Sequence, residues 1–296
     1  MEMLVAIAAT WLLSAPGEAG LEVLARLDHG RIPEASGVVA SLRHPGVFWV
    51  HNDSGNPPLL FAVRADGRIV GQFRVGAANV DWEDLVLDDQ GRLYLGDIGN
   101  NGGRLPLRAI YRLDEPDPSR AADRPLAVTL ATFYTPTSAT GRFDSEAMIL
   151  NGHEMILIAK SHDGLEAELF AVPLDPPAPV IRPARPRPLG RLAKFTEPVT
   201  GAGASRDGAL LAVCSGSVAR VYSRTPERPW PLLGEVRYNA PAIEGIAWDG
   251  LDLVLVAEGG PMYRIREKTW RGPSGSSRTL PHPRGAAKSS PGRSDR

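Results

Sequence analysis

Five short segments of the sequence begin alike, and each places an oxygen-bearing side chain before an apolar run. The clearest of them reads Asp81-Trp82-Glu83-Asp84. Aligning the five segments gives one column of residues: Ser36, Glu83, Glu146, Thr200 and Glu244. Hydroxyl and carboxylate oxygens are the ligands that hard cations such as Ca²⁺ prefer. We therefore predict that these five residues, called the column residues below, surround one metal ion.

The residue types of the column favour Ca²⁺ over other metals. Three carboxylates held close together cannot all stay ionised without a counter-ion. Ca²⁺ accepts about six to eight oxygen ligands, and water can complete the set. The column contains no His or Cys, which argues against zinc and copper. The alternative is that the column residues only hydrogen-bond to water and backbone in a central channel.

A second set of polar residues follows the next apolar run of each repeat. Its members are Asn52, Asp97, Lys160, Cys214 and Glu258. Since an antiparallel second strand returns to the starting edge of the first, this set should lie beside the metal. We predict catalytic or ligand-binding roles for Asp53, Asp97, Lys160 and Glu258, and a buried apolar role for Cys214. Further polar neighbours are His51, Asn100, Asn101, Ser161, His162 and Asp163.

Short strands are the elements that must position these residues. The chain has 31 Gly and 27 Pro, which separate short apolar runs, as is typical of an all-β protein with many turns. The column residues are 47, 63, 54 and 44 positions apart. Repeats of about 40–50 residues with four strands each indicate a β-propeller. The two long spacings contain polar, Pro-rich insertions at 114–125 and 175–188.

The predicted fold is therefore an all-β, five-bladed β-propeller. The last repeat lacks a fourth strand, while Leu21–Leu27 alternates like a strand and precedes the first repeat. We predict that this N-terminal strand completes the last blade and closes the ring, which leaves few exposed sheet edges. The fourth strand of the third repeat is expected at 190–195. A six-bladed propeller and another all-β fold are the alternatives.

The two ends of the chain differ in composition from the repeats. Residues 1–19 are predicted to be a signal peptide, because the apolar core Leu4–Leu13 is too short to span a bilayer and small residues follow it. Its first residues lack the usual positive charge, so an uncleaved anchor is the alternative. The propeller should cover 20–270. Residues 271–296 include six basic residues, one acidic residue and few apolar ones, and are predicted to be a disordered basic tail.

Composition also limits the partners. The net charge is −1, so we expect no nucleic-acid partner. No later segment is long and apolar enough for a transmembrane helix. With Cys214 as its single cysteine, the chain cannot form an intramolecular disulfide. We expect a secreted or periplasmic monomer whose small-molecule or envelope ligand the sequence does not identify.

Two resemblances bear on function. The column resembles the central calcium ring of the calcium-activated nucleotidase (apyrase) family, whose members are secreted or lumenal five-bladed propellers that hydrolyse nucleoside di- and triphosphates. The resemblance implies that the column residues hold Ca²⁺, with Thr200 where the family usually has Ser. The family also places acidic and basic residues over the calcium, and Asp53, Asp97, Lys160 and Glu258 are assigned to such places by repeat position. Closer in sequence are exported bacterial propeller proteins with a DWED…GDIGDN signature, mostly of undefined function; in this chain the motif reads DWED…GDIGNN.

Three functions remain open, and the sequence does not decide whether the protein is an enzyme. The first is an exported, calcium-centred ligand-binding or scaffold protein of the cell envelope or exterior. The alternative is a calcium-dependent phosphohydrolase acting on nucleotides or other phosphate esters, with Asp53 or Asp97 as general base and Lys160 neutralising phosphate charge. The third is a glycosidase that uses carboxylates such as Asp53, Asp97 and Glu258.

Overall fold

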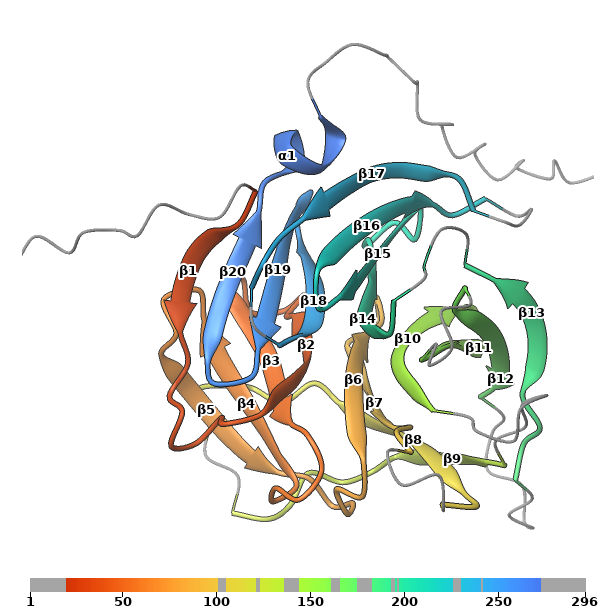
Figure 1. Ribbon diagram of the computed structural model, residues 1–296. Coiled ribbons are helices and arrows are strands. Elements are labelled where there is room, and N and C mark those ends of the chain that lie inside the picture. The colour runs from red at the N-terminus through yellow and green to blue at the C-terminus, as the bar shows by residue number, and fades with distance from the viewer. Residues whose placement is uncertain are drawn as a thin grey trace, which may run out of the picture.

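The computed structural model confirms an all-β, five-bladed β-propeller (Figure 1). The described residues are 20–100, 105–120, 123–135, 144–160, 166–174, 183–192, 195, 197–225, 230–240 and 242–272. In this part of the chain, five antiparallel four-stranded sheets surround a common centre. The innermost strands β2, β6, β10, β14 and β18 contact one another in sequence, and β18 returns to β2.

Each blade contains four strands, which run in the following order from the centre outwards. Blade one contains β2 (Ala35–Ala40), β3 (Val47–Asn52), β4 (Leu59–Arg64) and β5 (Ile69–Arg74). Blade two contains β6 (Trp82–Leu87), β7 (Arg92–Asp97), β8 (Arg108–Asp114) and β9 (Leu130–Tyr134). Blade three contains β10 (Ser145–Asn151), β11 (Glu154–Ala159), β12 (Glu168–Pro173) and β13 (Arg187–Arg191). Blade four contains β14 (Val199–Ala204), β15 (Leu210–Ser215), β16 (Val218–Ser223) and β17 (Leu232–Arg237). Blade five contains β18 (Ile243–Asp249), β19 (Asp252–Ala257), β20 (Pro261–Ile265) and β1 (Glu22–Arg26).

The N-terminal strand closes the ring as predicted. β1 is the outermost strand of blade five and pairs antiparallel with β20. Leu21 and Leu27 flank β1, and each is only 4% exposed. The first and last described strands therefore belong to the same sheet, although almost the whole sequence separates them.

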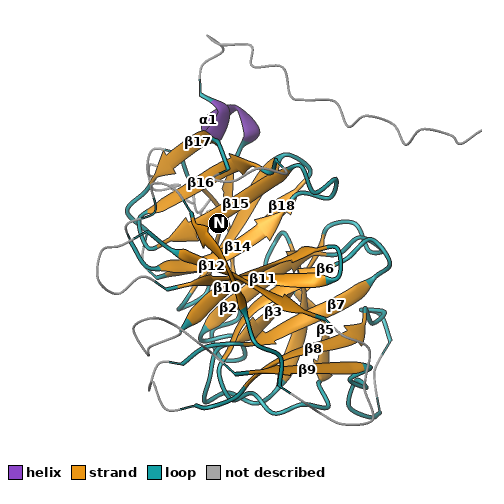
Figure 2. Ribbon diagram, turned by 90° about the vertical axis from the view of Figure 1, so that its right-hand side faces the viewer, coloured by secondary structure: helices purple, strands orange, loops and turns teal. Residues whose placement is uncertain are grey.

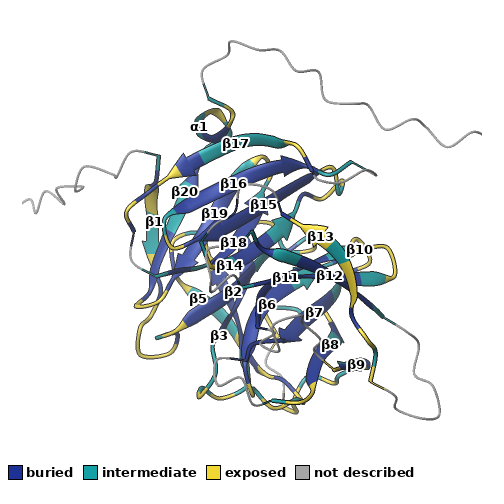
Figure 3. Cartoon of the chain, turned by 45° about the vertical axis from the view of Figure 1, so that its right-hand side comes forward, coloured by how far each residue is buried: buried dark blue, intermediate teal, exposed yellow. Residues whose placement is uncertain are grey.

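The apolar core lies between the blades. Buried apolar residues form five clusters, and each cluster draws mainly on two neighbouring blades. In one of them Trp49 of blade one packs with Leu95 of blade two. Because the innermost strands face a neighbouring blade on both sides, they are buried along most of their length (Figure 3). This packing fixes the inner strands whose ends carry the column residues.

Two elements differ from the sequence expectation. The fourth strand of blade three, β13, begins at Arg187 rather than at 190 and so uses part of the predicted insertion. Pro188 is compatible with this strand because β13 is a sheet edge, where one face of the backbone needs no partner. A short helix, α1 (Glu267–Arg271), follows β20 and was not expected (Figure 2). Its Trp270 is 2% exposed and donates Nε1–H to Leu251 O at 2.9 Å, so the last turn of chain before the predicted tail packs on the propeller.

Several sequence predictions lie outside the described residues. These are the signal peptide at 1–19, the tail beyond Gly272, and the polar neighbours Asn101, Ser161, His162 and Asp163. Within the described ranges, no helix has the length and apolar character needed to cross a membrane.

Candidate functional site

The five column residues occupy the same structural position, at the start of the innermost strand of each blade. Each lies where the pairing between the first and second strands skips a residue, which defines a β-bulge. In blade two, Trp82 pairs with Asp97 and Asp84 pairs with Gly96, so Glu83 has no residue opposite. A bulge redirects a side chain away from the regular alternation of a strand. The repeated bulge therefore explains how every blade offers one residue to the central channel.

Most of the predicted site residues line one cavity of about 220 Å³ at this end of the channel. This space is called the central cavity below. Its lining includes four column residues: Ser36, Glu83, Glu146 and Glu244. It also includes Asp53, Lys160 and Glu258, together with Glu34 and Ala35. The structure thus brings together seven of the nine residues that the sequence suggested, and Thr200 and Asp97 are not part of this lining.

Asp53, Lys160 and Glu258 reach the cavity because they share one position just beyond the second strand of their blades. In each case the backbone N–H donates to the carbonyl two residues before the column residue. The distances are 2.9 Å from Asp53 to Glu34, 2.7 Å from Lys160 to Asp144, and 3.0 Å from Glu258 to Ala242. These bonds extend the strand pairing by one step and hold the three side chains at the cavity mouth.

Asp97 has a different position from the residues with which the sequence grouped it. It pairs with Trp82 inside the sheet, one residue before the position of Lys160 and Glu258. Its Oδ1 accepts a hydrogen bond of 2.7 Å from the backbone N–H of Asp81. Burial raises the pKa of Asp97 to about 6. Asp97 therefore supports the chain leading into Glu83 and does not face the cavity.

The two hydroxyl residues of the column hold neighbouring blades together. Ser36 Oγ donates to the carbonyl of Glu83 at 2.8 Å, and Thr200 Oγ1 donates to the carbonyl of Ile243 at 2.7 Å. Cys214 lies next to Thr200, with 3.6 Å between Sγ and Oγ1. It is fully buried, and this burial raises the pKa of its thiol. Thr200 and Cys214 thus have packing roles at the blade interface.

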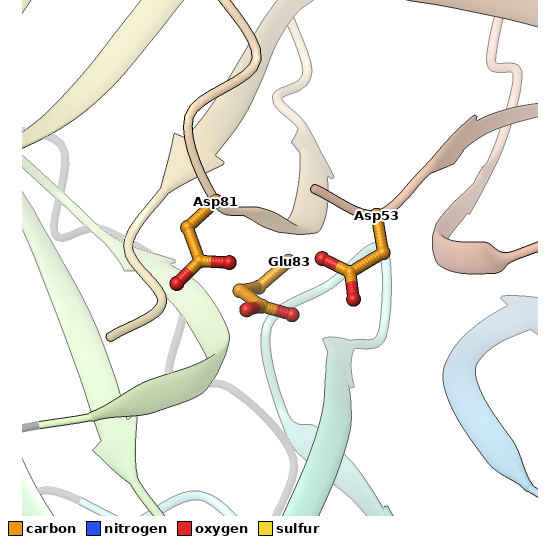
Figure 4. A group of neighbouring side chains, drawn as sticks. All are labelled: Asp53, Asp81 and Glu83. Carbon is orange, nitrogen blue, oxygen red and sulfur yellow. The ribbon is translucent and has the colours of Figure 1, made fainter. Parts of the chain in front are cut away.

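Three carboxylates converge on blades one and two. Asp53, Asp81 and Glu83 each offer an oxygen atom, and these atoms lie within 4.8 Å of one another (Figure 4). Asp81 belongs to the motif from which the sequence analysis began, but it was not predicted as a ligand. Glu83 is 2% exposed, and its Oε1 has no hydrogen-bond partner among the described residues. An unsatisfied buried carboxylate oxygen is costly unless a cation or a proton compensates for it.

Gly99 leaves the space that this cluster occupies. A methyl group added there would overlap Glu83 Oε1 and would lie 2.6 Å from Asp81 Cγ. The N–H of Gly99 also donates to Asp81 O at 3.1 Å. Gly99, the second glycine of the GDIGNN segment, therefore allows two carboxylates to lie close to the backbone. This is a structural reason for its place in the motif.

Glu146, whose side chain neighbours that of Glu83, has an ammonium partner. Lys160 Nζ lies 2.6 Å from Glu146 Oε1, and the two side chains are 21% and 6% exposed. Lys160 is the one basic residue among those that line the cavity, which otherwise presents six carboxylates. The lining is therefore strongly acidic, with its single positive charge on blade three.

Burial raises the pKa of every glutamate in the column, and neighbouring charges modify the effect. It raises the pKa of Glu83 well above its ordinary value, and the charge of Glu146 adds to this. The pKa of Glu146 rises to about 7 because burial outweighs the lowering by Lys160. The pKa of Glu244 rises to about 8, again mainly through burial and then through the charge of Glu146. These shifts indicate that the positive charge near the column glutamates does not balance the negative charge of their carboxylates.

Asp84 is a central residue that the sequence analysis did not single out. It follows Glu83, and its carboxylate accepts hydrogen bonds of 2.8 Å from the N–H groups of Leu85 and Met148. Met148 belongs to blade three, so Asp84 joins two blades inside the channel. Complete burial raises its pKa well above the ordinary value. Blades one, four and five have glycine at the equivalent position, where a methyl group would lie within 3 Å of the backbone of the next inner strand: 2.9 Å from Leu85 N at Gly37, 2.8 Å from Glu244 O at Gly201, and overlapping Ser36 O at Gly245.

The donor atoms of the central cavity fit a hard divalent cation. They are carboxylate oxygens from several blades, one of them unpartnered, and Gly99 keeps them close. The set differs from the predicted ring, because Asp53 and Asp81 join Glu83 while Thr200 stays at the blade interface. The ligands that Ca²⁺ prefers are of this kind.

The channel opens differently at its other end. There the ends of the inner strands and the turns after them surround a wider hollow of about 680 Å³. Leu87, Ala204 and Trp248 contribute apolar surface, and Asp89 and Arg206 contribute charges of both signs. The two mouths of the channel thus differ in size and chemistry: the wider one combines apolar surface with acidic and basic side chains, while the narrower one is lined by six carboxylates and one lysine.

Comparisons with known proteins do not assign the chain to a family. No protein-family model matches it, and no curated protein matches it. Among solved structures, Raptor of Chaetomium thermophilum has 14% identity and a TM-score of 0.37 over 78% of this chain and 19% of that chain. Hsv2 of Kluyvelomyces marxianus has 14% identity and a TM-score of 0.33 over 80% of this chain and 61% of that chain. The chain spans less than two thirds of either, and similarity at this level does not inform its function.

Proposed function

We propose that this protein is an exported ligand-binding or scaffold propeller whose central cavity binds Ca²⁺. The fold itself is suited to ligand binding or scaffolding in general. The observation that carries the proposal is Glu83 Oε1, a buried carboxylate oxygen without a partner that borders a cavity lined by six carboxylates. Asp53, Asp81 and Glu83 would be the first ligands, and Glu146 and Glu244 border the same space.

Cation binding would also stabilise the propeller. The carboxylates come from four blades, so a cation that several of them bind together stabilises the closed ring relative to the unfolded chain. The chain has one cysteine and cannot use an intramolecular disulfide for this purpose. Extracellular calcium sites commonly work at dissociation constants of about 10⁻⁴–10⁻³ M. Export, which we infer from residues 1–19, would expose the site to such concentrations.

A calcium-dependent phosphohydrolase is the second candidate, favoured by one observation. Lys160 and Asp53 line the same cavity as the carboxylate cluster, so a phosphate-neutralising group and a base would be at hand. Two features count against it. The cavity of about 220 Å³ is smaller than the roughly 300–1,000 Å³ of usual small-molecule pockets, and its many carboxylates would repel an anionic substrate. Binding is therefore the better-supported function.

A calcium titration of the melting temperature tests the proposal. The full chain would be stripped with chelator and heated with and without Ca²⁺. At about 100 times the dissociation constant, binding contributes about 2.7 kcal/mol, which corresponds to a rise of roughly 5–10 °C for a domain of this size. Glu83→Gln should remove most of this rise. The matched control is Glu168→Gln on the outer side of blade three, where a surface ion pair with Arg191 contributes little.

Gly99→Ala gives a second test that leaves every carboxylate in place. The added methyl group overlaps Glu83 Oε1 and should push the carboxylates apart. We expect Ca²⁺ affinity to fall at least about tenfold, since a cation site depends on ligand distances within a few tenths of an ångström. An unchanged calcium response in both Glu83→Gln and Gly99→Ala would refute the site. Calcium-dependent phosphate release from nucleotides that Glu83→Gln abolishes would move the assignment to the hydrolase.

A further inference from the structure

The repeat of the fold allows blades three and five to be compared position by position. Glu146 and Glu244 are both column residues in a bulge of the inner strand. Lys160 and Glu258 are both the first residue beyond the second strand, and each donates its backbone N–H to the residue two before the column. The pair Glu146–Lys160 in blade three therefore corresponds to the pair Glu244–Glu258 in blade five.

In blade three, a lysine side chain of the protein itself provides the cation that pairs with the column glutamate. The ammonium group of Lys160 lies 2.6 Å from Glu146 Oε1 at the cavity wall. This contact demonstrates that a column glutamate and the adjoining space accept an alkylammonium group. A charge-assisted hydrogen bond of this length is among the stronger polar contacts in proteins.

Blade five has the acceptors for such a contact without the donor. The side chains of Glu244 and Glu258 make no hydrogen bond or ion pair among the described residues, and Glu258 is exposed at the cavity mouth. The charges of Glu146, Glu258 and Asp53 act on Glu244, and so does the charge of Lys160 with the opposite sign, although Lys160 forms its ion pair with Glu146. A divalent cation at the Asp53–Asp81–Glu83 cluster would still leave more carboxylates than positive charges around the cavity.

We propose that the blade-five side of the central cavity, formed by Glu244 and Glu258, binds a primary ammonium group of the ligand in the way that Glu146 binds Lys160. The inference deepens the proposed function by naming the chemical class of the ligand: an alkylammonium group, carried either by a free diamine or by a lysine side chain of a protein partner. The mouth is open at Glu258, so the remainder of the ligand lies outside the cavity. An anionic ligand does not fit this side.

Calorimetry on the full chain at pH 7 with saturating Ca²⁺ tests the inference. The probes are Nα-acetyllysine methylamide, its uncharged analogue Nα-acetylnorleucine methylamide, putrescine and methyl phosphate. We expect the two ammonium probes to bind and the other two not to. Binding of acetyllysine methylamide alone would indicate a protein side chain, and binding of putrescine alone would indicate a free diamine.

Two substitutions at Glu258 make the test specific to this side. Glu258→Gln should weaken ammonium binding about tenfold by removing one charge. Glu258→Lys should abolish it, because the new side chain would occupy the position that Lys160 occupies in blade three. Glu168→Lys on the outer side of the third blade is the control for charge and should bind like the wild type.

The same samples separate this inference from the proposed function. If Ca²⁺ raises the melting temperature but no ammonium probe binds, the inference fails and the calcium site stands. If the probes bind but Ca²⁺ has no effect, the calcium proposal fails and the ammonium site stands. Equal binding of acetyllysine and acetylnorleucine methylamides, tighter binding of methyl phosphate, or full binding by Glu258→Lys would each overturn the inference.

Discussion

Glu146 and Glu244 have the same place in their blades but different neighbours. Burial is the main reason that the pKa of each is raised, to about 7 for Glu146 and about 8 for Glu244. Lys160 contacts Glu146 directly and lowers its pKa, whereas the charges of Glu146, Glu258 and Asp53 raise the pKa of Glu244 and Lys160 lowers it without an ion pair. A single lysine thus makes two equivalent positions chemically different, and the difference can be measured.

These shifts predict how stability depends on pH. In the cation-free protein, Glu244 keeps its proton up to about pH 8, whereas the unfolded chain releases it near the ordinary value of 4.5. Between these two values the folded state binds more protons than the unfolded state, so the free energy of unfolding must fall as pH rises. In chelator, we expect the melting temperature of the wild type to decrease between about pH 5 and 8 more steeply than that of Glu244→Gln.

Calcium should remove much of that difference, because a bound cation replaces the protons as the compensating charge. The control is Glu168→Gln, whose carboxylate lies on the outer side of blade three, and its pH profile should follow the wild type. Parallel profiles for the wild type and Glu244→Gln in chelator would show that Glu244 titrates normally, and the electrostatic description of the cavity would then be wrong.

At the scale of the strand, the sequence predicted the repeated blades and the column residues. It did not predict correctly which residues lie opposite them on the second strand. The period of the apolar runs indicated five blades and the column Ser36, Glu83, Glu146, Thr200 and Glu244. The apolar run of β7 ends one residue earlier in its strand than that of β11, so the partner position in the second strand could not be read from apolar runs alone. Asp97 was therefore grouped with Lys160 although it lies one step earlier in the sheet.

Other features depend on tertiary contacts that no local pattern reveals. Asp81 and Asp84 flank Glu83 in one continuous motif, yet Asp81 joins the acidic cluster and Asp84 bonds to the backbone of blade three. Only the packing of the inner strands separates their roles. α1 is a five-residue helix that is stabilised by the burial of Trp270. A segment of this length has little intrinsic helix stability, so its sequence does not predict a helix.

Asp84 gives a prediction at the scale of neighbouring strands. Its carboxylate is the acceptor for the buried N–H groups of Leu85 in β6 and Met148 in β10. Asp84→Ala leaves both donors without a partner, which should lower the free energy of unfolding by about 2–4 kcal/mol. Asp84→Asn keeps an acceptor oxygen and should lose less. Denaturant unfolding measures both values.

The exposed Asp89, at the turn after β6, provides the control. Asp89→Ala removes an acid from the same blade without leaving a buried donor unpaired, and should change stability by no more than about 0.5 kcal/mol. If Asp84→Ala unfolded at the same denaturant concentration as Asp89→Ala, the contact between blades two and three would not depend on this carboxylate.

For the whole molecule, closure of the ring decides whether the cavity exists. Each carboxylate is fixed by its own blade, but the distances between blades depend on a ring that is complete. β1 supplies the last strand of blade five through its pairing with β20, and Leu21 and Leu27 anchor it in the core. Deleting residues 20–27 would expose the edge of β20 and open the core between blades one and five.

We expect this deletion to abolish cooperative melting. Loss of two buried leucines alone costs roughly 2–5 kcal/mol each, which is a large part of the about 5–15 kcal/mol that stabilises a typical domain. Leu27→Ala keeps the strand and should instead show a lower but still cooperative transition. Val23→Ala is the matched control, because Val23 is 65% exposed on the same strand and should melt like the wild type. A truncated chain that still melted cooperatively and bound Ca²⁺ with wild-type affinity would mean that the carboxylates keep their spacing without a closed ring.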